Sequence, residues 1–365
     1  MLKIVDVGTI ATIKDGTKEN NNSTLIASSV LCTNGDILLA YNSGIDLSPG
    51  QFVGLMRSSD LGKTWIKNDF KIHSIFSNGG IESGCTLTKL KNGRILLPYS
   101  DGYYLYPEDY GNVERRSFFG CAYSDDDGVT WTKPEMEGHK ELENYVYSKV
   151  IEFPEKDILV MPMWGSDTTS TLWQSRVYRS YDKGETWTDS VTIDPDFCDE
   201  TTLVKLPNSN KMLAVIRNHK NLQKIKKMYH KNVDKCDQYF AKTTAESSFH
   251  ITTSSNCGKS WKEIQTTNIA GTAASLHITP KGKLIIGFRT KTSPSNKCVI
   301  YSSKNQGKSW KKEFYLKPLT GSWRWGGYPS FLNLPDGRIF VSFMNSKPGN
   351  GGLFFNILEE CEKES

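Results

Sequence analysis

The octapeptide Ser124-Asp125-Asp126-Asp127-Gly128-Val129-Thr130-Trp131 decides the fold, because the chain repeats its pattern. The pattern Ser-x-Asp-x-Gly-x-Thr-Trp is found again further along the chain, with Asn for Asp and Ser for Thr in the last two copies. The other copies are Ser58–Trp65, Ser180–Trp187, Ser254–Trp261 and Ser303–Trp310. Five copies at intervals of roughly 50 to 75 residues indicate a repeated supersecondary unit.

Each copy has the residues of a tight turn followed by a strand. The Asp or Asn side chain closes an Asx-type turn, and the Gly supplies the positive φ that such a turn needs. The Ser and Thr hydroxyls satisfy nearby amides, and the Trp covers the turn where the next strand begins. The turns are therefore expected to be structural, and chemistry is expected elsewhere.

A second repeat precedes the octapeptides: an apolar run, a short turn and another apolar run, the pattern of a β-hairpin. Six copies are present, one more than the number of octapeptides. They are Leu25–Tyr41, Ser83–Tyr99, Val146–Met163, Glu200–Arg217, Thr272–Arg289 and Tyr328–Met344.

A third strand leads into each octapeptide and a fourth follows its Trp, which gives four antiparallel strands per unit. Six such units predict an all-β fold, a six-bladed β-propeller with four-stranded antiparallel blades. The sixth unit has no octapeptide, and Leu2–Ile10 is expected to complete it and close the ring. We expect one domain over residues 1–365, with a long insert at about 218–247 in blade four.

Composition narrows the class of protein. The chain of 365 residues has 30 glycines and 11% aromatic residues, which suits short strands and tight turns. It has no apolar run long enough for a membrane span and no visible signal peptide, so we expect a cytoplasmic protein. The eight cysteines are scattered and are expected to be thiols. The six histidines do not cluster, so no metal site is predicted, and a net charge of +5 is mild.

Strand direction predicts which side chains meet. If strand 1 of every blade starts at an upper face, both kinds of turn lie on the lower face. Strand-1 starts, strand-2 ends and the loops from strand 2 to strand 3 then gather at the upper mouth of a central funnel. The residues expected there are Glu82, Glu200, Arg217, Arg289, Tyr328, Asp46, Asp101 and Trp164. This mixture of acids, cations and a phenol suits acid/base and nucleophilic work on a sugar.

The octapeptides resemble the Asp boxes of the sialidase (neuraminidase) superfamily. Glu200-Thr-Thr-Leu-Val-Lys-Leu with Ile216-Arg217-Asn218 is similar to that family's blade-four glutamate and arginine. Gly327-Tyr328-Pro329-Ser330 resembles the segment of the tyrosine nucleophile, and Gly44-Ile45-Asp46 the loop of the acid/base aspartate.

The resemblance implies a retaining exo-glycoside hydrolase that acts on a terminal sialic acid or related acidic sugar. Tyr328 would be the nucleophile, Glu200 its base and Asp46 the proton donor to the leaving oxygen. The partner would be a carbohydrate, with no cofactor, nucleic acid or membrane required.

The chain departs from the family at the arginines that hold the substrate carboxylate. Arg217 matches one, but Leu25-Ile26-Ala27 and Ser295-Asn296-Lys297 stand where the other two are expected. Arg289, Arg324, Arg57 or Lys297 could replace them from another position. Two alternatives therefore stay open: a propeller glycosidase or lyase for a different sugar, and a non-catalytic glycan-binding propeller in which Tyr328 is a packing aromatic.

Overall fold

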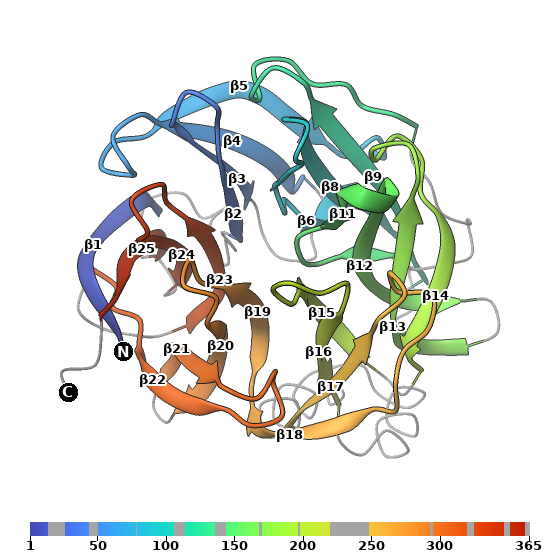
Figure 1. Cartoon of the computed structure of the whole chain (residues 1–365). Helices are drawn as coiled ribbons and strands as arrows, with labels where there is room; N and C mark the ends of the chain where they lie inside the picture. The colour runs from blue at the N-terminus through green and yellow to red at the C-terminus, as the bar shows by residue number, and fades with distance from the viewer. Residues whose placement is uncertain are drawn as a thin grey trace.

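The computed structural model is a ring of six β-sheet blades around a central axis (Figure 1), the last two of which are joined into one eight-stranded sheet by a single bridge between Asn296 and Trp325. Its described residues are 1–13, 26–43, 50–77, 79–105, 114–135, 144–167, 170–195, 198–219, 248–292, 295–319, 325–346 and 351–361. Each sheet runs outward from an innermost strand beside the axis, and the blades follow one another in chain order. The predicted six-bladed β-propeller with antiparallel blades is confirmed.

The strands group into six blades, which are numbered here in chain order. Blade 1 holds β2 (Ala27–Leu31), β3 (Ile37–Ser43), β4 (Phe52–Ser58) and β5 (Ile66–His73). Blade 2 holds β6 (Gly79–Gly84), β7 (Thr88–Lys89), β8 (Ile95–Leu105) and β9 (Glu114–Ser124). Blade 3 holds β10 (Tyr145–Val146), β11 (Ile151–Phe153), the 3-10 turn η1 (Pro154–Lys156), β12 (Ile158–Asp167), β13 (Ser170–Ser180) and β14 (Thr188–Asp194).

The remaining blades complete the circle. Blade 4 holds β15 (Cys198–Lys205), β16 (Met212–Asn218), β17 (Ser248–Ser254) and β18 (Gln265–Ala270). Blade 5 holds β19 (Thr272–Ile278), β20 (Leu284–Thr292), β21 (Ser295–Ser303) and β22 (Lys311–Tyr315). Blade 6 holds β23 (Trp325–Asn333), β24 (Ile339–Ser346), β25 (Gly351–Glu360) and β1 (Leu2–Ile13).

The N-terminal strand closes the ring, as expected from the sequence. Strand β1 pairs antiparallel with β25, from Leu2 opposite Glu360 to Ile13 opposite Gly351. Figure 1 shows β1 as the outermost strand of a sheet whose inner strands come from the end of the chain. Because backbone hydrogen bonds join the two ends of the chain, blade 6 cannot form without both.

Two blades differ from the regular plan. In blade 2, β6 and β7 share the place of the innermost strand, and the fourth strand is reduced to one bridge between Tyr123 and Thr132. In blade 3, the expected two-residue turn at Glu155-Lys156 is the 3-10 turn η1, closed by Asp157 in a left-handed conformation. The insert predicted at 218–247 lies outside the described residues from 220 onward.

The repeated octapeptides form the expected side-chain-closed turns. In the second copy, the Ser124 hydroxyl accepts from the Gly128 N–H at 2.8 Å and donates to Asp126 Oδ1 at 2.7 Å. The Thr130 hydroxyl donates to Asp126 Oδ2 at 2.6 Å, and the Trp131 indole donates to the Gly128 carbonyl at 3.2 Å. The side chains of Ser124, Asp126, Thr130 and Trp131 thus bond within the turn, whereas Asp125 bonds to Arg94, and Asp127 to Thr33 and Lys89, outside it.

The glycine of each turn packs against the preceding blade. A Cβ added to Gly128 would lie 2.5 Å from Leu38 in strand β3 of blade 1. The other four copies repeat this contact around the ring: Gly62 with Phe340, Gly184 with Leu96, Gly258 with Val177 and Val160, and Gly307 with Ile251 and Leu213. The turns therefore join adjacent blades, and the hydrophobic core lies between the blades rather than in one central mass.

The described cysteines are thiols, and the strands account for almost all of the regular structure that is described. None of the seven cysteines in the described ranges takes part in a disulfide, as expected, while Cys236 lies outside those ranges. Among the described residues, the structure has no helix of the length and apolar character that a membrane span requires.

Replacing Gly128 with Ala tests the contact between blades, with Gly35→Ala as the matched control. Both glycines have a left-handed backbone, at φ +83° and +89°, but only Gly128 faces a neighbouring side chain. Gly35→Ala is expected to cost about 1 kcal/mol from backbone strain alone. Gly128→Ala should cost about 1–3 kcal/mol more, because its methyl group overpacks Leu38. Urea unfolding of both variants measures the difference, and equal losses would contradict the inter-blade role.

Asp126→Asn tests the electrostatics of the turn through its pH dependence. Hydrogen bonds from the Thr130 hydroxyl and N–H lower the pKa of Asp126 to about 2. The stabilisation by the ionised carboxylate is therefore complete above pH about 4 and is lost as the pH falls towards 2. In blade 4, Asn256 makes the corresponding bonds to Ser260, so the variant should be close to the native protein at pH 7.

Below pH about 4, the native protein is expected to lose stability relative to Asp126→Asn, which has no such proton to take up. Urea midpoints measured at pH 5, 4 and 3 check this. Parallel curves for the two proteins over that range would show that the Asp126 carboxylate contributes nothing in its ionised form.

Candidate functional site

Four successive innermost strands bring one residue each, at the same register position, to the upper mouth of the ring. In blades 4, 5 and 6 a β-bulge interrupts the pairing of strand 1 with strand 2, directly after the pairs Asp199–Arg217, Thr272–Arg289 and Gly327–Met344. A bulge inserts one extra residue and re-aims its side chain. The residues at this position are Tyr147, Glu200, Ala273 and Tyr328, which follow the paired residues Val146, Asp199, Thr272 and Gly327.

Three of these residues have a left-handed backbone. The φ angles are +25° at Glu200, +54° at Ala273 and +52° at Tyr328. Such a conformation costs a non-glycine residue about 1–3 kcal/mol and is found preferentially at functional sites. The packing of the ring therefore holds Glu200 and Tyr328 in positions that their own sequences do not favour.

The Glu200 carboxylate is the centre of the cluster. Glu200 is only 5% exposed, and its Oε1 accepts a hydrogen bond from the Tyr328 hydroxyl at 3.2 Å. Its Oε2 accepts from the Ala273 N–H at 2.7 Å and lies 3.0 Å from Arg217 Nη1. One oxygen is thus held by fixed donors, and the other faces the phenol.

Arg217 is shared between two neighbouring carboxylates. Its Nη1 lies 3.3 Å from Asp199 Oδ2, and the same Asp199 oxygen is 3.0 Å from His219 Nε2. Burial alone would raise the pKa of Asp199, but Arg217 and His219 outweigh it, so the pKa lies below its usual value. Burial likewise opposes the charge of Arg217, but the two carboxylates raise its pKa. Arg217, Asp199, Glu200 and His219 thus form a buried ion network, and Arg217 is paired within it.

Two further side chains surround the phenol of Tyr328. The ring of Tyr147 lies 6.3 Å from it, and burial, with Glu200 and Tyr328 adding to it, raises the pKa of Tyr147 well above its usual value. The Arg289 guanidinium lies 5.1 Å from the Tyr328 ring centroid, and its Nε donates to the Gly326 carbonyl at 2.7 Å. A Cβ on Gly327 would lie 2.3 Å from Arg289 Nη2, so a larger residue there would displace the guanidinium from its present position.

The structure brings Glu200, Arg217, Arg289 and Tyr328 together, as the strand order predicts. Asp46 and Arg324 lie outside the described residues, and of Glu82 only the backbone in β6 is described. Their roles therefore stay predictions.

Asp101 and Trp164 lie on strands β8 and β12 and have other neighbours. Asp101 is buried, its Oδ2 accepts from the Ile75 N–H at 2.9 Å, and burial raises its pKa. Trp164 stacks on Tyr145 at 4.1 Å and meets Trp173 edge-on at 4.9 Å. Trp173 in turn lies 6.5 Å from His219, so an aromatic row connects Trp164 to the ion network.

Two of the proposed replacement cations for the substrate carboxylate are engaged elsewhere. Arg57 lies at the lower turns, where Nη1 pairs with Asp36 at 3.3 Å. Lys297 lies over the ring of Tyr315 at 5.2 Å, on the outer strand of blade 5. Among the described candidates, Arg289 alone stands beside Tyr328.

Sequence reasoning missed Asp199, His219 and Tyr147. Asp199 and His219 flank the predicted Glu200 and Arg217 on the same hairpin, and the bulge pairs Arg217 with Asp199 instead of Glu200. Tyr147 follows the predicted strand start Val146 as Tyr328 follows Gly327. Comparing that position across the repeats would have found it.

One group of possible metal ligands occurs within the described ranges. Asp194, Cys198 and His250 place a ligand atom each within 4.8 Å of one another, at the junction of blades 3 and 4. His250 Nδ1 and Asp194 Oδ2 are 2.6 Å apart and already form a hydrogen bond. The group lies behind the Asp199–Glu200 pair and can fix its strand without a metal.

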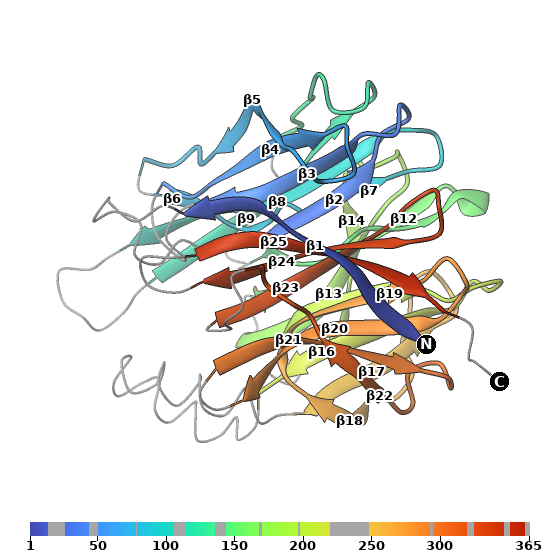
Figure 2. The ribbon, with the colours of Figure 1, turned by 90° about the vertical axis from the view of Figure 1, so that its left-hand side faces the viewer.

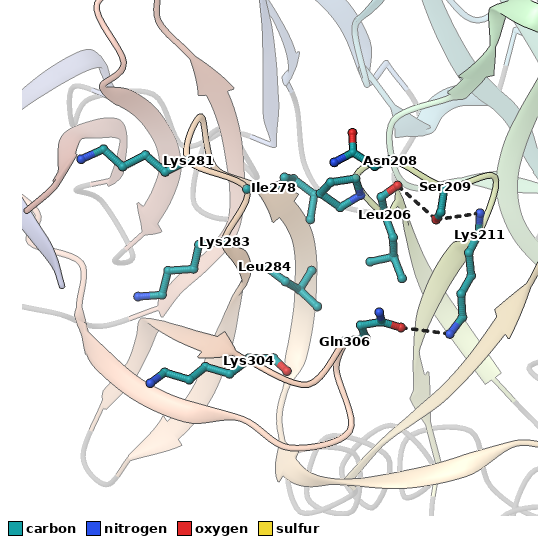
Figure 3. A pocket seen from close by; sticks show the side chains of 13 residues that line it. Leu206, Asn208, Ser209, Lys211, Ile278, Lys281, Lys283, Leu284, Lys304 and Gln306 are labelled. Atoms are coloured by element: carbon teal, nitrogen blue, oxygen red, sulfur yellow. Dashed lines mark hydrogen bonds between the residues drawn. The ribbon is translucent and has the colours of Figure 1, made fainter. Parts of the chain in front are cut away.

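A cavity of about 820 Å³ lies on the lower face, between the turns of blades 4 and 5. Figure 3 shows Lys211 bonded to Gln306 at 3.1 Å, with Lys281, Lys283 and Lys304 at the other side. Lys283 pairs with Glu313 at 2.6 Å. The residues that line this cavity include lysines but no carboxylate, so they form no acid–base pair. The candidate site is therefore the upper mouth of the ring.

Comparisons with known proteins agree with this architecture. A family model described as "BNR repeat-like domain" matches residues 9–227 and 159–364. No curated protein matches.

Several solved structures share the fold. A protein of unknown function from Dyadobacter fermentans is 19% identical, with a TM-score of 0.71 over 98% of this chain and 100% of that one. An α-L-arabinanase of Penicillium chrysogenum, complexed with arabinobiose, is 16% identical, with a TM-score of 0.65 over 96% and 98%. A leech intramolecular trans-sialidase is 12% identical, with a TM-score of 0.62 over 94% and 68%.

Arg217→Met tests the buried ion network. The change leaves Asp199 and Glu200 buried without their shared cation, so a loss of about 3–5 kcal/mol at pH 7 is expected. Adding Asp199→Asn removes one of the two carboxylate charges and should recover part of that loss. Urea unfolding of the single and double variants measures the coupling.

Arg338→Met is the matched control, because Arg338 pairs with Asp336 at an exposed turn. Its loss is expected to stay below about 1 kcal/mol. A loss as small in Arg217→Met would contradict the network.

Proposed function

The chain belongs to the family of BNR repeat-like domains, and on this basis we propose that it is an exo-acting glycoside hydrolase whose nucleophile is Tyr328. Its fold is that of propeller glycoside hydrolases. The proposed substrate is a glycan with a terminal sialic acid or related acidic sugar, cleaved with retention of configuration.

One observation carries the proposal: the Tyr328 hydroxyl donates to the buried Glu200 carboxylate at 3.2 Å. A phenol is a weak nucleophile unless a nearby base takes its proton. Glu200 is placed for that, because Arg217 and the Ala273 N–H hold its other oxygen. Both reacting side chains stand on strained bulges at the open end of the ring. A packing aromatic with a structural ion pair would not require this geometry.

The proposed reaction has two displacements. In the first, the Tyr328 oxygen forms a bond to the anomeric carbon as the bond to the leaving oxygen breaks. The phenol proton passes to Glu200, and the predicted acid Asp46 gives a proton to the leaving oxygen. In the second, a water oxygen bonds to the anomeric carbon as the bond to the Tyr328 oxygen breaks; the water gives a proton to Asp46, and Glu200 returns its proton to the Tyr328 oxygen. Where the anomeric carbon bears a carboxylate, a neutral phenol approaches with less repulsion than a carboxylate would.

A second candidate is a propeller glycosidase for a neutral sugar. The observation that favours it is that Arg217 is already neutralised by Asp199 and Glu200. An arginine in that state has less charge to offer a substrate carboxylate. The P. chrysogenum structure is a complex with arabinobiose, so arabinosides belong in any substrate panel.

The test is hydrolysis of aryl sialosides, uronides and arabinosides by the native protein and by Tyr328→Phe. The variant should lose about 10³-fold or more of kcat/KM, because it lacks the attacking oxygen. Glu200→Gln should lose about 10²–10⁴-fold. Tyr315→Phe, on the outer strand β22, is the matched control and should keep full activity.

The same panel of substrates distinguishes the proposed functions from one another. Turnover of the sialoside supports the acidic sugar, and turnover of arabinosides alone supports the neutral one. Binding of a glycan without turnover would leave a non-catalytic glycan-binding propeller. Full activity of Tyr328→Phe on any substrate would refute the phenol as nucleophile.

A further inference from the structure

A small cavity of about 40 Å³ lies on the axis of the ring, next to Tyr328. Innermost strands of five blades line it. Its hydroxyl groups come from Ser28, Thr86, Ser148, Ser275 and Ser330, and its only charged lining residue is Lys149. Five blades thus each contribute one serine or threonine to the lining of a cavity that also contains Lys149.

Two of these hydroxyls have no partner within the protein. Ser28 and Thr86 are 3% and 6% exposed, and their oxygens make no hydrogen bond to any described residue. A buried hydroxyl without a partner costs free energy, so such groups normally face a water or a ligand. By contrast, Ser148 donates to Thr202 at 3.3 Å. Unsatisfied donors therefore face the cavity.

The Lys149 ammonium crosses the axis and supplies the charge. Its Nζ donates to the backbone carbonyls of Ser29 at 2.9 Å and Phe331 at 3.0 Å, which join blade 3 to blades 1 and 6. An ammonium has three N–H donors, so one remains. No carboxylate of the described chain forms a salt bridge with it.

Lys149 is the cation that lines this cavity at neutral pH. Burial lowers its pKa to about 8, which leaves it mostly protonated at pH 7. Burial lowers the pKa of the neighbouring His277 to about 4, against the hydrogen bond with Asn333 and with Lys149 adding to the effect, so His277 is neutral.

We propose that this axial cavity is a binding site for one small anion, held by Lys149 and by the hydroxyls of Ser28 and Thr86. The cavity has room for a chloride or a carboxylate group but not for a sugar ring. Donors predominate among its polar groups, so a cation would be repelled by Lys149. A site of this kind neutralises a charge with which no carboxylate of the described residues forms a salt bridge.

Two sources of the anion share this chemistry. A free anion, such as chloride or formate, could occupy the site permanently. Alternatively, the carboxylate of an acidic sugar could enter from the Tyr328 side, which rests on the proposed function. The first source requires no substrate, so the two can be separated.

Bromide soaking of native crystals tests the site directly, since bromide replaces chloride and has a strong anomalous signal. A peak within hydrogen-bonding distance of Lys149 Nζ and the Ser28 and Thr86 hydroxyls is expected. In solution, the midpoint of thermal unfolding should rise with sodium bromide or formate and then saturate, compared with sodium gluconate at equal ionic strength. No axial bromide and equal midpoints in all three salts would overturn the proposal.

Variants assign the binding to the named groups. Lys149→Met should weaken the apparent affinity for bromide at least about tenfold, and Lys304→Met, an exposed lysine with the same change in net charge, should not. Because Lys149→Met also loses two inter-blade bonds, Ser28→Ala and Thr86→Val provide the milder test. Unchanged bromide affinity in all three cavity variants would overturn the assignment.

Kinetics then identify the source. If a sugar carboxylate uses the site, bromide and formate should compete with an acidic-sugar substrate and not with a neutral one. If they bind without such competition, the site holds a free anion. Bromide density and thermal midpoints do not depend on turnover, so an inactive protein would refute the proposed function and leave the anion site intact.

Discussion

The structure depends on the contact between each repeated turn and the blade before it. A propeller blade exposes two apolar faces, so it is stable only when its neighbours cover both. The octapeptide glycine allows the turn to press against strand 2 of the preceding blade, as Gly128 does against Leu38. Side-chain hydrogen bonds to the Ser and Asp of the turn keep that glycine in place. The spacing between blades, and hence the position of every innermost strand, follows from this contact.

Because the contact is repeated, the innermost strands of the blades occupy equivalent positions around the axis. Figure 2 shows the blades from the side, with the strands running between the two faces of the ring. At the upper face, the bulge position carries Glu200, Ala273 and Tyr328 in three adjacent blades. The repeat supplies one backbone geometry, and the different side chains supply the chemistry. Even Ala273 contributes, through the N–H that its bulge turns towards Glu200.

The sequence predicted the fold well because its repeats are local signals. Asx turns, glycines and apolar alternation each have a short-range cause, so the blade count and the strand order follow from them. The pairings of Val146 with Met163 and of Thr272 with Arg289, the ends of two predicted hairpins, are confirmed to the residue. The bulge was not predicted, since an extra unpaired residue leaves no mark in the alternation of a short strand. It shifted the partner of Arg217 from Glu200 to Asp199.

The side chains of the candidate site were predicted less completely. Whether two side chains meet depends on their height along the axis of the ring as well as on the order of their blades. Lys149 lies in a segment where blade 3 interrupts its inner strand, so no repeat position marks it. The Asp46 prediction concerns a loop rather than a strand, where no repeat fixes the geometry, and both Asp46 and Arg324 lie outside the described residues.

The charges at the mouth constrain what the site can bind. Asp199 and Glu200 are two buried carboxylates, and Arg217 lies between them with a single positive charge, so the three groups together are not positive. Their sum, with neutral tyrosines around it, offers an anionic substrate no net attraction. Among the described residues, the cations beside Tyr328 are Arg289, over its ring, and Lys149, in the lining of the axial cavity. Both cations thus lie near Tyr328. A substrate that used both would have to present its negative charge close to this tyrosine, the residue that we propose as the nucleophile.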